Sequence, residues 1–97
     1  MAAVAERPAW TFLTSHGAML IEVARDPDAT VRELAERSSV TERQAHRILA
    51  DLCSEGYVSR QRVGRRNHYR VHESAPMRIR SLQSHTIGEL LSIMQSS

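Results

Sequence analysis

Arginines are the residues in this sequence whose type and clustering best suit a chemical task. Seven of them lie between Arg60 and Arg80, where Glu73 is the only acid. All 13 basic residues of the chain are arginines, and its formal net charge is +2. A solvated face normally mixes both signs of charge. This one-sided segment therefore predicts a localised polyanionic partner, nucleic acid before a membrane surface.

The densest arginine cluster, RVGRRNHYR at residues 62–70, is flanked by β-forming sequence. YVSRQRV before it and HYRVH after it favour two strands, and Gly64 permits the positive φ of a connecting turn. We expect a hairpin anchored to the core by Tyr57, Val58, Val63, Tyr69 and Val71. A planar guanidinium suits phosphates and narrow minor grooves. The candidate DNA contacts here, with Arg65 and Arg66 foremost and some of the arginines expected to stay solvated, are Arg60, Arg62, Arg65, Arg66, Asn67 and Arg70.

Two short helices are predicted immediately before the hairpin. Thr30 with Glu33, and Thr41 with Gln44, have the spacing of capping boxes that begin helices. Ala45, Ile48, Leu49 and Leu52 form one apolar stripe of the second helix, and Gly56 ends it. Because only about three residues join the two helices, the pattern predicts a helix-turn-helix.

The second of these helices, over residues 41–55, has polar residues opposite its apolar stripe. Arginine pairs with guanine and glutamine with adenine in the major groove, each worth about 1–3 kcal/mol of discrimination. The candidate contacts are Thr41, Glu42, Arg43, Gln44, His46 and Arg47. Arg43 and Arg47, one turn apart, are the foremost. Glu42 has an alternative role at the helix dipole, and Thr41 and Gln44 have one in capping.

The ends of the chain carry further apolar residues. We expect an N-terminal segment at residues 1–13, a winged helix-turn-helix domain at 14–73 whose first helix covers about residues 15–25, and a C-terminal dimerisation helix at 74–97. The fold class is then mainly α with a small β-hairpin. A domain this small should not leave so much apolar surface exposed, which favours a homodimer over packing on its own core alone. The residues expected at the dimer interface are Trp10, Phe12, Ile79, Leu82, Thr86, Ile87, Leu90, Leu91, Ile93 and Met94.

Other classes of function are disfavoured by what the 97 residues contain. There is no nucleophile–base arrangement, glycine-rich phosphate loop or carboxylate pair, so we expect no enzyme. Cys53, the single cysteine, allows no internal disulfide, suits the cytoplasm and is expected to be buried and inert. No metal site or other cofactor is expected. His68 and His72 would lie roughly 13 Å apart along a strand, too far for one zinc, and His85 with Glu89 supplies too few ligands. No stretch is long and apolar enough for a membrane helix.

Residues 30–72 resemble the DNA-binding half of MarR- and ArsR-type bacterial transcriptional regulators, through TVRELAERSSVTERQAHRILADLCSEGYVSR and RVGRRNHYRV. With PAWTFLTSHGAMLIEVARDPDA and SHTIGELL, nearly the whole chain resembles small winged-helix regulators of actinobacteria. The resemblance implies a homodimer on double-stranded DNA, with the second helix of the motif in the major groove and the wing beside the minor groove. The paired-cysteine metal motif of ArsR-type repressors is absent. A protein-interaction adaptor and an RNA-binding winged helix are the alternatives, and any small-molecule effector stays open.

Overall fold

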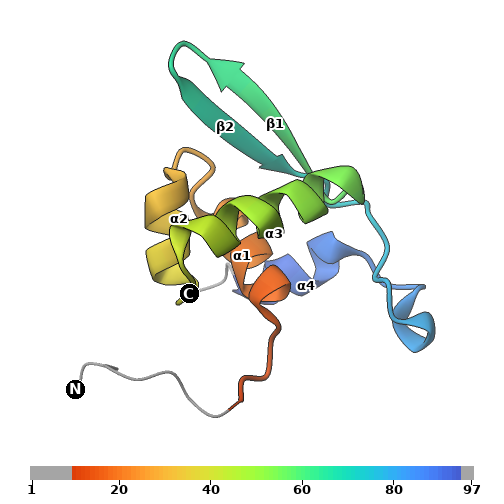
Figure 1. Cartoon of the computed structure of the whole chain (residues 1–97). Helices are drawn as coiled ribbons and strands as arrows, with labels where there is room; N and C mark the ends of the chain where they lie inside the picture. The colour runs from red at the N-terminus through yellow and green to blue at the C-terminus, as the bar shows by residue number, and fades with distance from the viewer. Residues whose placement is uncertain (1–9, 95–97) are drawn as a thin grey trace.

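The computed structural model describes residues 10–94 and has the order of elements of a winged helix (Figure 1). Three helices come first, and a two-stranded hairpin, a short 3-10 helix and a last helix follow. Their bounds are α1 (Ser15–Arg25), α2 (Val31–Arg37), α3 (Glu42–Ser54), β1 (Val58–Val63), β2 (Arg66–Val71), η1 (Arg80–Leu82) and α4 (Ile87–Met94). The predicted fold class, mainly helical with a small β-hairpin, is confirmed. None of the described helices is long and apolar enough to cross a membrane.

The helix starts are fixed by side-chain caps. The Thr30 backbone amide donates to Glu33 Oε1 at 2.8 Å, and the Glu33 amide donates to the Thr30 hydroxyl at 3.1 Å. Thr41 and Gln44 make the same reciprocal pair at 2.9 and 3.1 Å. Each box satisfies amides that the first helical turn leaves without partners, so both predicted capping boxes are confirmed.

The turn between α2 and α3 requires one unusual backbone conformation. Ser39 lies in the left-handed region at φ 58°, although it is not a glycine. The Val40 amide then donates to the Ala35 carbonyl at 3.0 Å, which closes the turn against the end of α2. This tight connection holds α3 at a fixed angle to α2, as a helix-turn-helix requires.

A single apolar core joins the helices to the base of the hairpin. The largest side chains that are less than 2% exposed are Met19, Val23, Leu34, Val58 and Leu91, which come from α1, α2, β1 and α4. Burying each of them stabilises the fold by about 1.5–3 kcal/mol relative to exposure. Because α1 packs against α2, α3, β2 and α4, it is the central element of this core.

The hairpin extends away from the core (Figure 1). Its antiparallel register runs from Val58 opposite Val71 to Val63 opposite Arg66, and Gly64 turns it at φ +63°. Val58 and Tyr69 are buried, but Val63 is 59% exposed. The prediction that Val63 anchors the hairpin is wrong, because it sits beside the tip, beyond the reach of the core.

The C-terminal helix is shorter than the sequence pattern predicted. Residues 74–86 contain η1 and an antiparallel bridge between Pro76 and Thr86, and α4 begins only at Ile87. The cause is a third capping pair: the Thr86 amide donates to Glu89 Oε1 at 2.7 Å, and the Glu89 amide donates to the Thr86 hydroxyl at 3.3 Å. The T-x-x-E spacing of Thr86 and Glu89 is the sequence signal for this helix start, and it competes with the longer apolar stripe.

Candidate nucleic-acid interface

The solvent face of α3 presents two arginines. Ala45, Ile48, Leu49 and Leu52 are buried, which turns Arg43 and Arg47 outward, one turn apart. Neither guanidinium makes a hydrogen bond or ion pair within residues 10–94. Further along the same face lie Ala50 and Ser54, whose small side chains let the helix backbone approach a partner closely. The exposed face of α3 thus has, among the described residues, two arginines without protein partners in its N-terminal half and small side chains in its C-terminal half.

The remaining α3 candidates have partners of their own. Gln44 Oε1 accepts hydrogen bonds from both the amide and the hydroxyl of Thr41, so the capping alternative for these residues is present in the structure. The Nε2 group of Gln44 is the part of that side chain left for a base. Glu42 lies 3.9 Å from His46, both more than half exposed. On the other flank of the helix, Asp51 contacts His16 at 2.8 Å.

The hairpin register sorts the wing arginines onto two faces. Arg60 lies opposite Tyr69 and Arg62 opposite Asn67, and directly opposed residues of an antiparallel pair share a face. Burial raises the pKa of the Tyr69 hydroxyl, while the neighbouring Arg60 charge and hydrogen bond act in the opposite direction. Arg60 is therefore held close to the core, whereas Arg62 bends toward the turn and donates to the Gly64 carbonyl at 3.4 Å.

The opposite face of β2 is attached to the loop between α1 and α2. The Arg66 guanidinium donates to the Asp28 carbonyl at 3.0 Å, and His68 Nδ1 lies 2.6 Å from the Asp28 carboxylate. Arg65 and Arg70 are exposed and make no ion pair or hydrogen bond through their side chains within the described residues. Of the two foremost wing candidates, only Arg65 is therefore without a protein partner in this part of the chain.

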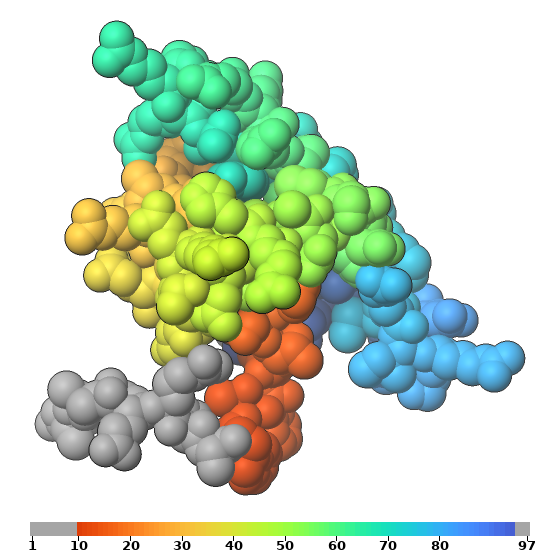
Figure 2. Space-filling view, viewed as in Figure 1, coloured from red at the N-terminus to blue at the C-terminus, as the bar shows by residue number. Residues whose placement is uncertain are grey.

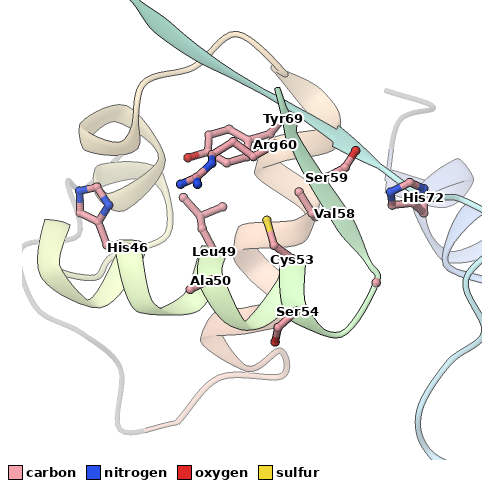
Figure 3. Close-up of a pocket in the computed structure, with 11 residues that line it drawn as sticks. His46, Leu49, Ala50, Cys53, Ser54, Val58, Ser59, Arg60, Tyr69 and His72 are labelled. Atoms are coloured by element: carbon pink, nitrogen blue, oxygen red, sulfur yellow. The ribbon is translucent and has the colours of Figure 1, made fainter. Parts of the chain in front are cut away.

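A groove of about 640 Å³ separates α3 from the hairpin (Figure 3). Its walls carry basic and hydrogen-bonding groups from both elements, including His46 on α3 and Arg60 on β1. The Cys53 sulfur points from α3 toward the hairpin side of this groove. Cys53 is only partly buried, so the prediction of a buried thiol is wrong. The groove exists because the hairpin leaves the end of α3 at an angle.

The apolar residues predicted at a dimer interface fall into two groups. Ile87 and Leu91 are 5% and 2% exposed and pack in the core of their own chain, and their place at a dimer interface stays a prediction. Thr86 and Leu90 are partly buried. The other predicted residues all stay exposed, and they are Trp10, Phe12, Ile79, Leu82, Ile93 and Met94.

The exposed apolar residues lie on different segments. Phe12 lines a hollow against the start of α1 and the end of α2, whereas Leu82 and Ile93 line a groove of about 470 Å³ between the η1 segment and α4.

Within residues 10–94 no three metal-binding side chains come together. His85 and Glu89 contact each other at 3.3 Å.

Comparison with solved structures supports the fold. The chain is similar to the PcaV transcriptional regulator from Streptomyces coelicolor, whose structure is in complex with its natural ligand. The two share 18% sequence identity with a TM-score of 0.58, over 84% of this chain. The chain spans 60% of the length of PcaV. A search of curated proteins finds no match.

Comparison with family models identifies the family. The model described as MarR family matches residues 12–66, which is more than half of the 97 residues. The matched range contains the helices α1, α2 and α3, the strand β1 and the start of β2. The chain therefore belongs to the MarR family of winged-helix transcriptional regulators.

Proposed function

We propose that this regulator binds duplex DNA sequence-specifically, with α3 in the major groove and the hairpin on the minor groove or the backbone. The observation that carries the proposal is that α3 and the hairpin, the two elements that carry the candidate arginines, lie on one face of the molecule (Figure 2). Arg43 and Arg47 face solvent on α3. An α-helix about 10–12 Å wide fits the major groove, which is about 12 Å wide.

The groove between α3 and the hairpin suits a sugar–phosphate strand. A protein that occupies a major groove and the neighbouring minor groove must straddle the one strand that separates them. In this chain the straddled space is the groove lined by His46 and Arg60. We therefore assign Arg60 to a phosphate, Arg43 and Arg47 to base edges, and Arg65 to the minor groove or a flanking phosphate.

We further propose that the protein acts as a homodimer. Trp10 and Phe12 are 74% and 96% exposed, and Leu82 and Ile93 line an apolar groove. A second copy of the chain would cover such surfaces and would present a second α3. Two recognition helices about 34 Å apart read two half-sites on one side of the duplex. Sedimentation of the purified protein with and without Phe12→Ser tests this directly, since a monomer at micromolar concentration contradicts the proposal.

The DNA-binding test is a salt titration of the affinity for duplex DNA. For an operator selected from random sequence, the logarithm of the binding constant should fall linearly with the logarithm of salt concentration, by about 0.9 per neutralised phosphate. Arg43→Ala/Arg47→Ala should remove the preference for the operator over unrelated duplex. Arg65→Ala/Arg70→Ala should flatten the slope on every duplex alike.

Matched removal of charge elsewhere is the control. Arg78→Ala/Arg80→Ala deletes the same two positive charges from the η1 segment and its approach, where Arg78 contacts Glu55 at 3.5 Å, at the end of α3 opposite to Arg43 and Arg47. This control should leave the operator preference intact. If the control pair and the α3 pair weaken binding equally, general electrostatics explains the affinity and α3 reads nothing. If no variant matters and wild-type binding is negligible at low salt, the winged helix is a protein-interaction adaptor instead.

A further inference from the structure

The distal half of the hairpin has almost no apolar support. Val58 is the only buried residue of β1 and Tyr69 the only buried residue of β2, and both belong to the half nearer the core. An isolated two-stranded hairpin is at best marginally stable in water. Residues 62–67, which carry Arg65 and Arg66, therefore need another attachment to keep a defined position beside α3.

The loop between α1 and α2 supplies that attachment. The Pro27 carbonyl accepts a hydrogen bond from the Tyr69 amide at 3.2 Å, so the loop lies along the outer edge of β2. Next in sequence, Asp28 makes two contacts nearer the tip. Its carboxylate lies 2.6 Å from His68 Nδ1, and its carbonyl accepts from Arg66 at 3.0 Å. The outermost of these three contacts falls on the first residue of β2.

The loop itself is fixed to the helix-turn-helix. The Asp26 carboxylate forms an ion pair at 3.2 Å with Arg37, which lies at the end of α2. The same carboxylate accepts a hydrogen bond from the Asp28 amide at 3.2 Å. Ala29, next to Asp28, is 2% exposed. A continuous series of contacts thus connects α2 through Asp26 and Asp28 to the hairpin.

We propose that Asp28 is a positioning residue for DNA binding, which sets the orientation of the hairpin relative to α3. The inference rests on the proposed DNA-binding function and goes beyond it, because Asp28 touches no DNA in this assignment. The contact also gives two adjacent arginines different roles: Arg66 donates to the α1–α2 loop, and Arg65 can bind the DNA.

Because Asp28 carries a negative charge, the direction in which its removal changes the affinity for DNA tests the inference. Removing a carboxylate near a bound polyanion should strengthen binding through electrostatics alone. Loss of a positioning contact should weaken it. Glu36, an exposed acid on α2 with no side-chain partner within the described residues, provides the matched control.

The experiment measures duplex affinity, its salt slope and native-state amide exchange for five variants of the full chain. Asp28→Ala should bind about threefold to fivefold more weakly than wild type, the range expected for one exposed charge-assisted contact. Its salt slope should fall by about 0.9, since one wing phosphate contact is lost. Glu36→Ala should bind equally or more tightly. Asp28→Asn, whose amide oxygen can still accept from His68, should restore the affinity.

Amide exchange separates this inference from the function on which it rests. In the protein without DNA, Asp28→Ala should speed exchange in residues 62–69 and leave α3 unchanged. His68→Ala should reproduce both effects, and the double variant should add little to either. If wild type binds DNA and Asp28→Ala binds as tightly as Glu36→Ala, the positioning role is wrong while the function stands. If wild type binds no DNA, the proposed function fails, and unchanged exchange in the hairpin would overturn the positioning role independently.

Discussion

The two arginine-bearing regions, α3 and the hairpin, are supported in different ways. α3 rests on four buried residues and begins with a capping box, so Arg43 and Arg47 project from a rigid support. The hairpin has one buried residue in each strand and is attached through polar contacts to the α1–α2 loop. For the proposed DNA binding, the difference implies a division of labour: side chains on a packed helix suit readout of bases, and side chains on a hairpin held by polar contacts suit the sugar–phosphate backbone.

The largest effect should come from breaking the support of α3. Leu49→Ala removes a side chain that is 3% exposed and should lower the free energy of unfolding by about 2–5 kcal/mol. Val63→Ala, at a hairpin position 59% exposed, should change it by less than about 0.5 kcal/mol. Urea denaturation followed by circular dichroism measures both. Equal losses would show that the hairpin is as tightly packed as the helix.

A smaller effect should follow from straining the hairpin tip. Gly64 has φ +63° with no heavy atom near the position of an added Cβ, so Gly64→Ala costs backbone strain and no steric clash. About 1 kcal/mol is the expected penalty for a left-handed alanine. Because few core contacts depend on the tip, the cost should appear as faster amide exchange at residues 62–67 and weaker DNA binding. A fall in global stability without either change would contradict this separation.

The caps of the helices should respond differently to acid. Hydrogen bonds from Thr30 lower the pKa of Glu33, and hydrogen bonds from Thr86 and His85 lower that of Glu89. A carboxylate whose pKa is lower in the folded protein stabilises it above the unfolded value of about 4.3, and this contribution is lost as pH falls through the folded pKa. The cap of α3 uses Gln44, which does not titrate.

Acidification from neutral pH should therefore loosen the first turns of α2 and α4 before that of α3. Amide exchange measured as a function of pH tests the order. Glu33→Gln should remove the acid response of α2, and Gln44→Glu should introduce one in α3. Simultaneous loosening of all three helix starts in wild type would mean that the caps do not control it.

The smallest effect concerns Cys53, which lies in the groove between the two regions. Because its sulfur is only partly buried, iodoacetamide should alkylate it in the native protein at a measurable rate. Bound duplex DNA should slow that reaction if a strand covers the groove, whereas Cys53→Ser should retain DNA binding. Mass spectrometry of time points gives both rates. An unchanged rate on DNA binding would place the strand elsewhere.

Sequence patterns predicted this fold well where local rules suffice. Capping boxes at Thr30 and Thr41, Gly64 at the hairpin turn and the apolar stripe of α3 each act within a few residues. The same local reasoning failed beyond residue 74. An apolar stripe from Ile79 to Ile93 fits a long helix, but the pairing of Pro76 with Thr86 and the cap at Thr86 break it. Periodicity alone does not reveal such a break.

The sequence by itself determined the chemistry of the candidate surface: arginines on one helix face, arginines around one turn, and a helix-turn-helix to carry them. Tertiary structure decided which of those side chains are available. Arg66 and His68 meet Asp28 across 38 and 40 residues of sequence, and Ile87 and Leu91 enter the core beneath α1. The physical reason is that residue type and spacing encode contacts within a turn or two. Which side chain pairs with a given charge, and which enters the core, is decided only when segments distant in the sequence pack together.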